Sequence, residues 1–209
     1  MPPASEQIAR LPVRGADDID LVTRALHLTL IVFGVAAWLS GDLSDFEERT
    51  VSLGFTLHRW LGIAASAAVG LRITWGVIGP RGVRFSSWVP ATWKHWRLVL
   101  EDIGMLLRLR LPERAAHQGL AGVVQSFGLL VFAWAAATGS VLFFWLEPGV
   151  RPGFWLDLVK DFHEVGETLI PAFLAVHVGA TMVHGLAGNT RWRRMLFLSD
   201  EQTPQRPMP

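Results

Sequence analysis

The residues best suited to chemistry are four histidines inside apolar stretches of the chain, namely His27, His58, His163 and His177. His163 and His177 lie in one stretch, residues 161–186, about 21 Å apart along a helix and only about 40° apart around its axis. One helix face would therefore offer two imidazoles at two depths of a bilayer whose apolar core is about 30 Å thick. An imidazole is costly in hydrocarbon without a partner, so intramembrane histidines indicate function. Haem iron takes histidine as an axial ligand, and two depths predict two metal centres.

Four apolar blocks must position these histidines. The chain has 209 residues, of which 51% are hydrophobic, and the block 119–146 contains no charged residue. About 20 apolar residues are enough to span a bilayer, and a soluble four-helix bundle would keep a polar outer face. We therefore predict an all-α integral membrane four-helix bundle with spans at residues 18–40, 51–78, 119–144 and 161–186. It forms one domain, residues 18–198, between the tails 1–17 and 199–209.

The connection between the second and third spans, residues 81–117, is long and basic. Its middle predicts an amphipathic helix at the membrane interface, and a helix for dimerisation or partner docking is the alternative. The net charge of +1 gives no indication of nucleic-acid binding. The chain has no cysteine, which excludes cysteine-ligated clusters and covalent CxxCH haem attachment, so any haem is held non-covalently.

The distribution of charge predicts the direction of each span. Lysines and arginines gather in the N-terminal tail, in residues 81–117 and at the C-terminal end, which places both termini in the cytoplasm. His58 and His163 then lie on the outer side, while His27 and His177 lie on the inner side. Each pair could hold one iron from both faces, and a haem closed in this way transfers electrons without binding oxygen.

Two other readings of the histidines stay open. A single intramembrane histidine is often a packed or hydrogen-bonded core residue, although four that match in depth two by two favour ligands. A zinc or copper site is the less favoured alternative to haem, because two ligands at each level are too few for the tetrahedral sites that zinc usually adopts.

Three arginines lie near the predicted depths of the histidine pairs. Arg72 is toward the inner end of the second span, Arg24 is one turn from His27, and Arg59 adjoins His58. Arginine binds carboxylates such as haem propionates in bidentate fashion, and the alternative is snorkelling to the lipid headgroups. We expect a propionate partner for Arg72 and snorkelling for Arg24 and Arg59.

Two further histidines, His117 and His184, are expected at the inner interface. Histidine titrates near neutral pH, so either could bind a quinone head group and exchange its protons. The alternative for each is an interfacial histidine in contact with water.

Several motifs together resemble the bacterial cytochrome b-561 family. They are RALH in the first span, LHRWLGI in the second and FHEVGETLIPAFLAVHVGATMVHGL in the fourth. This superfamily includes the cytochrome subunits of nickel–iron hydrogenases, formate dehydrogenases and thiosulfate reductases. The resemblance implies two b haems, with His27, His58, His163 and His177 as the ligands to iron.

The segments GPRGVRF and HQGLAG are most similar to stand-alone members of this superfamily. Their usual partners are periplasmic c-type cytochromes or oxidoreductase subunits. The chain departs from the family at the start of the third span, where His117-Gln118-Gly119 stands in place of the usual HNP.

The expected function is electron transfer across the bacterial inner membrane between the quinone pool and a periplasmic redox partner. An electron-transfer subunit of a respiratory oxidoreductase is favoured over a stand-alone enzyme. A self-sufficient quinone-linked superoxide or ferric oxidoreductase is the first alternative, and a non-redox membrane anchor or transporter is the second. Membrane lipid surrounds the bundle in every case, and a homodimer is compatible with it.

Overall fold

The computed structural model describes residues 20–43, 52–112, 114, 118–147, 150–189 and 191–198, and every element within them is helical. Four spans are long and apolar enough to cross a membrane, as predicted. The first span consists of α2 (Leu21–Thr29), the π-helical η1 (Leu30–Gly34) and α3 (Val35–Leu39), and the others are α4 (Leu53–Ile78), α7 (Leu120–Trp145) and α8 (Phe154–Leu186). The short elements are the 3-10 turn η2 (Gly41–Leu43), α5 (Phe85–Trp88), α6 (Trp93–Leu107) and α9 (Arg191–Met195).

Polar caps fix where two of the spans begin. Asp20 accepts a hydrogen bond from the backbone N–H of Thr23 at 3.0 Å and so caps α2. Ser52 accepts one from Phe55 N–H at 3.0 Å and caps α4. Each cap satisfies one of the amide groups that the first turn of a helix leaves without an intrahelical partner.

The first span differs from the uninterrupted α-helix that the sequence predicts. Residues 30–34 form a π turn, in which the hydrogen bonds reach one residue further than in an α-helix. The turn brings Gly34 against α7, because a Cβ atom at Gly34 would lie 2.9 Å from the Phe132 ring. A π turn of this kind is often found near functional sites.

The fourth span begins at Phe154, seven residues before the predicted start at residue 161. The added turns carry charge rather than a continuous apolar face, which is why the sequence pattern missed them. Lys160 forms an ion pair with Glu164 at 3.2 Å, one helical turn further on. A helix of 33 residues is about 50 Å long, so it exceeds the roughly 30 Å of a bilayer core.

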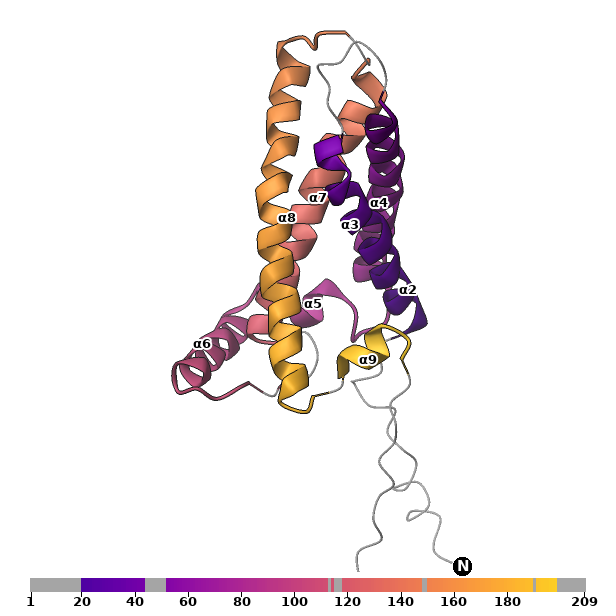
Figure 1. Cartoon of the computed structure of the whole chain (residues 1–209). Helices are drawn as coiled ribbons and strands as arrows, with labels where there is room; N and C mark the ends of the chain where they lie inside the picture. Colours follow the sequence, from indigo (N-terminus) through magenta and orange to yellow (C-terminus); the bar gives the residue numbers. More distant parts are fainter. Residues whose placement is uncertain are drawn as a thin grey trace, which may run out of the picture.

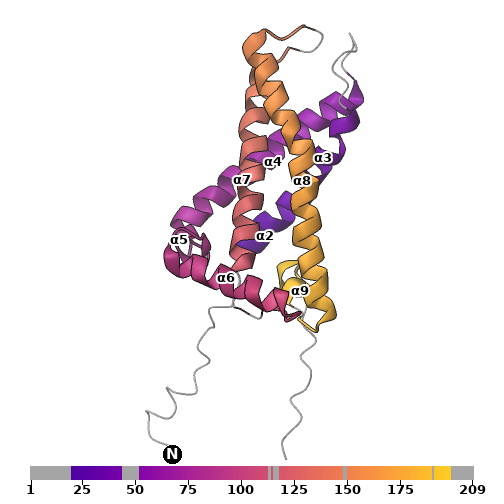
Figure 2. The same cartoon turned by 90° about the vertical axis from the view of Figure 1, so that its left-hand side faces the viewer.

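The spans pack side by side in the order α8, α7, α4 and the first span. Helix α8 runs alongside α7, and α4 crosses the other side of α7 while also packing on the first span (Figures 1 and 2). Large apolar side chains remain exposed on the outward faces, among them Leu130 at 70% and Met182 at 63%. A face of this kind suits lipid rather than water.

Helix α6 runs across the axis of the bundle at the end where α9 also lies (Figure 1). It is the amphipathic helix predicted between the second and third spans. Its most buried side chain is Asp102, which accepts hydrogen bonds from Arg114 Nε and, at 2.8 Å, from the backbone N–H of Leu120. The hydrogen bond to Asp102 raises the pKa of Arg114. These contacts tie α6 to the first turn of α7.

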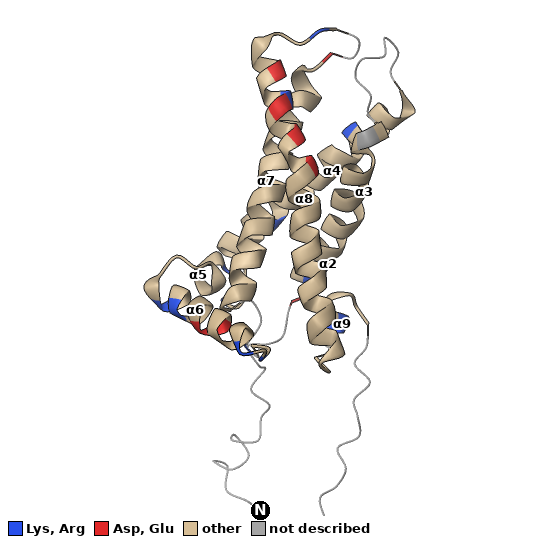
Figure 3. Ribbon diagram, turned by 60° about the vertical axis from the view of Figure 1, so that its left-hand side comes forward, with Lys and Arg blue, Asp and Glu red and all other residues tan. Residues whose placement is uncertain are grey.

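Charged residues separate to the two ends of the bundle (Figure 3). Acidic side chains lie on the first turns of α8, whereas α6 and α9 carry basic residues at the opposite end. We call these the acidic end and the basic end.

Candidate functional site: two facing histidine pairs

The structure brings the four span histidines together as two facing pairs. The ring centroids of His58 and His163 are 6.0 Å apart at an interplanar angle of 73°. Those of His27 and His177 are 6.3 Å apart at 60°. Both pairs join α8 to another span, and the two levels are separated by about 21 Å along α8.

These separations match the geometry of a metal ion held between two imidazoles. Two metal–nitrogen bonds of about 2.0 Å, with about 1.1 Å from each nitrogen to its ring centre, place coordinating rings about 6.2 Å apart. Both observed distances lie within a few tenths of an ångström of this value. The arrangement therefore fits one metal ion between each pair, with one imidazole from each of the two helices as a ligand.

The pair at the acidic end has its ring nitrogens assigned by hydrogen bonds. His58 Nδ1 lies 2.9 Å from the carbonyl oxygen of Ala37, which can only accept, so Nδ1 carries the proton. His163 Nδ1 lies 2.9 Å from Thr138 Oγ1. A protonated Nδ1 leaves Nε2 free to bind a metal, and its partner fixes the orientation of the ring.

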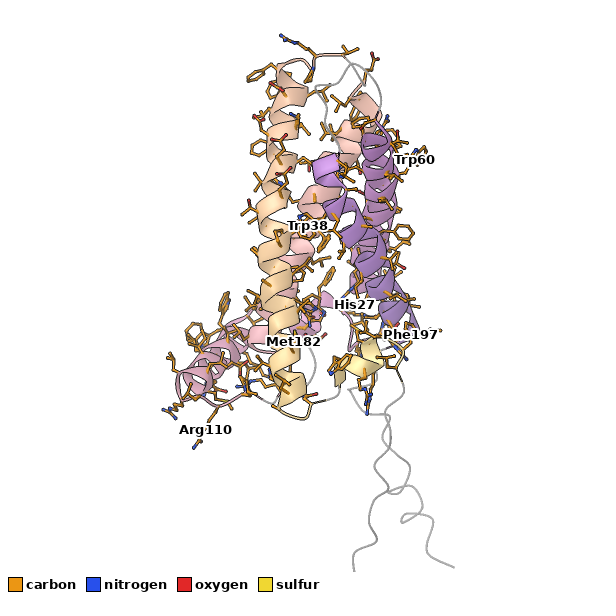
Figure 4. The ribbon with its side chains drawn as sticks, in the orientation of Figure 1. His27, Trp38, Trp60, Arg110, Met182 and Phe197 are labelled. Carbon is orange, nitrogen blue, oxygen red and sulfur yellow. The ribbon has the colours of Figure 1, made fainter. Side chains whose placement is uncertain are left out.

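In the pair at the basic end, aromatic packing holds the His177 ring. The His177 ring stacks on Phe173 with centroids 5.3 Å apart and planes at 19°. Phe173 in turn meets Phe132 edge to face at 6.1 Å. His27 points into the space between α2 and α8, where it faces His177 (Figure 4).

A cavity of about 520 Å³ surrounds His58 and His163. Its walls come from all four spans and include Gly34, Ala37 and Gly62 as small residues. This volume lies in the range of small-molecule and cofactor sites. No Cβ placed at Gly62 would meet another atom within 4 Å, so the glycine leaves open space beside His58 for a flat ligand.

Three arginines each have a guanidinium nitrogen that is buried in the protein. Arg24 Nε, Arg59 Nε and Arg72 Nη1 are buried without a hydrogen-bond partner among the described residues. The guanidinium groups pack on aromatic rings: Arg24 lies 4.1 Å from the Phe197 centroid, and Arg59 lies 4.8 Å from that of Phe143. A buried N–H without a partner is costly, so these atoms fit an anionic group such as a propionate.

Two predicted residues are not part of either pair. His117 lies outside the described residues. His184 lies in the last turn of α8, two turns beyond His177, and is half-buried. It lies at the basic end of the bundle, and its place at the inner interface stays a prediction.

Sequence reasoning missed the residues that support the histidines. Thr138 and Phe173 contact ligand-candidate rings, and Gly139 gives His163 its space, since a Cβ there would lie 2.9 Å from His163 Cε1. The available signal was the Thr138-Gly139 pair within an otherwise apolar span. Without the register between α7 and α8, that signal identifies no partner.

Facing histidine pairs inside a bundle of membrane-spanning helices define the class of membrane b-type cytochromes, which bind haem and transfer electrons. The comparison with known families agrees. The chain belongs to the prokaryotic cytochrome b561 family, whose model matches residues 18–197. No curated protein and no solved structure matched the chain in the same comparisons.

Proposed function

We propose that the chain binds two b haems non-covalently, one between His58 and His163 and one between His27 and His177. It would transfer electrons across the membrane from one to the other. The observation that supports this proposal is the matched spacing of the two pairs, 6.0 and 6.3 Å, near the value that two axial imidazoles require.

The protein's own groups orient and enclose the cofactors. Ala37 and Thr138 accept the Nδ1 protons of His58 and His163, which directs each Nε2 toward the metal position. Arg24, Arg59 and Arg72 supply buried donors for propionates. A bound haem would supply a centre that takes up and releases one electron, held by the two histidines of its pair.

The basic end is the cytoplasmic side in this proposal. Helices α6 and α9 and both termini then lie in or near the cytoplasm of a bacterial cell, at the inner membrane, as the positive-inside rule favours. A quinone would bind at this side, where His184 lies and where the sequence places His117. A periplasmic c-type cytochrome or oxidoreductase subunit would exchange electrons at the acidic end.

A self-sufficient superoxide or ferric oxidoreductase is less well supported. An enzyme that draws an anion to the outer haem needs a basic funnel beside His58 and Arg59. The cavity there is lined by Glu164 and Glu167 as well as by Arg59 and Lys160, so its charge is balanced. Electron exchange with a protein partner fits this lining better.

The test is haem stoichiometry by pyridine haemochrome on purified full-length protein, with wild type beside His58→Ala and His27→Ala. We expect two b haems in wild type and about one in each variant. A haem-replete wild type without haem would overturn the proposal. One haem in wild type that both variants lose would overturn the two-site assignment.

A further inference from the structure

Helix α7 contains no histidine, yet it contacts the supports of both α8 histidines. It therefore offers neither pair a ligand. Its contacts fall at two levels, one beside His163 and one beside His177.

At the acidic end, the Thr138 hydroxyl has a defined role. It lies 2.9 Å from the carbonyl oxygen of Trp134, which can only accept, so the hydroxyl donates its one proton there. With its proton directed to the backbone, the same oxygen is placed to accept from His163 Nδ1–H at 2.9 Å, in the tautomer that leaves Nε2 for a metal. Thr138 thus fixes both the tautomer and the rotation of the His163 ring.

The backbone next to His163 is also attached to α7. The indole N–H of Trp134 donates to the carbonyl oxygen of Phe162 at 2.8 Å, and the two rings pack edge to face at 5.5 Å. Gly139 completes this level, because any larger residue would press on the His163 ring. Hydrogen bonding and close approach together set where the imidazole lies.

At the basic end, α7 acts through a phenylalanine. A Cβ atom at Gly128 would overlap the ring of Phe173, so glycine is required for Phe173 to keep its place. Phe173 is 9% exposed and stacks almost parallel on His177. The Phe132 ring, also from α7, contacts Phe173 edge to face.

Gly128 and Gly139 are eleven residues apart, which is about three helical turns, so they lie on one face of α7. That face packs along α8. We propose that α7 is the positioning helix of the protein: Thr138 and Gly139 orient His163, and Gly128, acting through Phe173, orients His177. This inference rests on the proposed function, because it assigns the two histidines to two separate haems.

The first test is Thr138→Val, with Thr138→Ser as the conservative control, followed by potentiometric titration of both haems in purified full-length protein. A hydrogen bond from Nδ1–H makes the imidazole a more basic ligand, which favours ferric iron. Valine keeps the shape but cannot accept this bond. We therefore expect the potential of one haem to rise and that of the other to stay unchanged, with serine restoring the wild-type value.

The second test is Gly128→Ala beside the matched variant Gly139→Ala. Alanine at position 128 displaces Phe173 and should shift the potential and α-band of the haem that Thr138→Val leaves unchanged. Alanine at position 139 should instead alter the haem that Thr138→Val affects. If Gly128→Ala fails to accumulate in the membrane, Phe173→Leu removes the stacking without adding volume and has the same expected selectivity.

The outcomes separate the two proposals. Wild type without haem overturns the proposed function itself. Wild type with two haems, in which these variants shift both haems equally or neither, overturns the positioning role of α7 and leaves the proposed function intact. The role is supported if Thr138→Val and Gly139→Ala change only one haem and Gly128→Ala changes only the other.

Discussion

Removing the buried carboxylate of Asp102 should detach α6 from the bundle and destabilise the protein. The Asp102 side chain is 3% exposed and that of Arg114 is 23% exposed. Losing a hydrogen bond to a charged group typically costs about 1.5–3 kcal/mol. The partly exposed Arg114 that remains keeps a second contact, because its Nη2 lies 3.0 Å from Glu101 Oε2, so no unpaired buried charge is left and we take about 2–3 kcal/mol.

Asp102 also accepts the N–H of Leu120, the first residue of α7. Loss of a helix cap of this kind costs about 1 kcal/mol. Asp102→Ala should therefore lower the free energy of unfolding by about 3–4 kcal/mol. Asp102→Asn keeps one acceptor for Leu120 but loses the charge, so we expect about 2 kcal/mol.

The assay is unfolding in mixed SDS micelles, followed by tryptophan fluorescence, as a double-mutant cycle. The cycle compares Asp102→Ala, Arg114→Ala and the double variant with wild type. Two residues in direct contact should show a coupling energy of about 1–3 kcal/mol. Additive effects of the two substitutions would refute the reasoning, because they would show that the ion pair contributes nothing beyond its separate members.

Three further predictions follow from the structure. Arg72→Gln should lower the reduction potential of the haem at the His27–His177 level, and Arg59→Gln that of the other haem, because each substitution removes a positive charge that favours the reduced form. One charge at roughly 8–15 Å in an effective dielectric of about 20 contributes about 1–2 kcal/mol, or roughly 40–90 mV for one electron. Redox titration measures a shift of this size. If both variants shifted the same haem, the assignment of the arginines would be wrong. A green fluorescent protein fused after residue 209 should fluoresce and an alkaline phosphatase fused there should be inactive, because that terminus is predicted to be cytoplasmic. The reverse pattern would show that the predicted topology is inverted. Ser52→Ala should cost about 1 kcal/mol of unfolding free energy through loss of the α4 cap, whereas an unchanged midpoint would show that α4 begins without it.

The fold could be predicted because two simple rules determine it. Apolar length identifies the four spans, and the fourteen-residue spacing of His163 and His177 places two rings on one face of α8. Alternating helix direction then matches His58 to one level and His27 to the other. The structure brings the same residues together, and their role as iron ligands stays a prediction until haem is counted.

Other features depend on contacts that no single segment encodes. The π turn at residues 30–34 brings Gly34 against Phe132 on another helix, and nothing within the first span marks it. The early turns of α8 contain Asp157 and Lys160, so a search for a continuous apolar stretch leaves them out. Thr138 and Phe173 gain their roles only from the register between α7 and α8, which spacing along one helix cannot supply.

The two histidine pairs also have a consequence for stability. Each pair bridges α8 to a span other than α7: His163 faces α4, and His177 faces the first span. A metal held at either level would therefore cross-link helices on opposite sides of the bundle. Among the described residues, three buried guanidinium nitrogens have no hydrogen-bond partner, at a cost of about 1–3 kcal/mol each. An anionic group that satisfied them would stabilise only the folded chain, so cofactor binding would be coupled to helix packing through these residues.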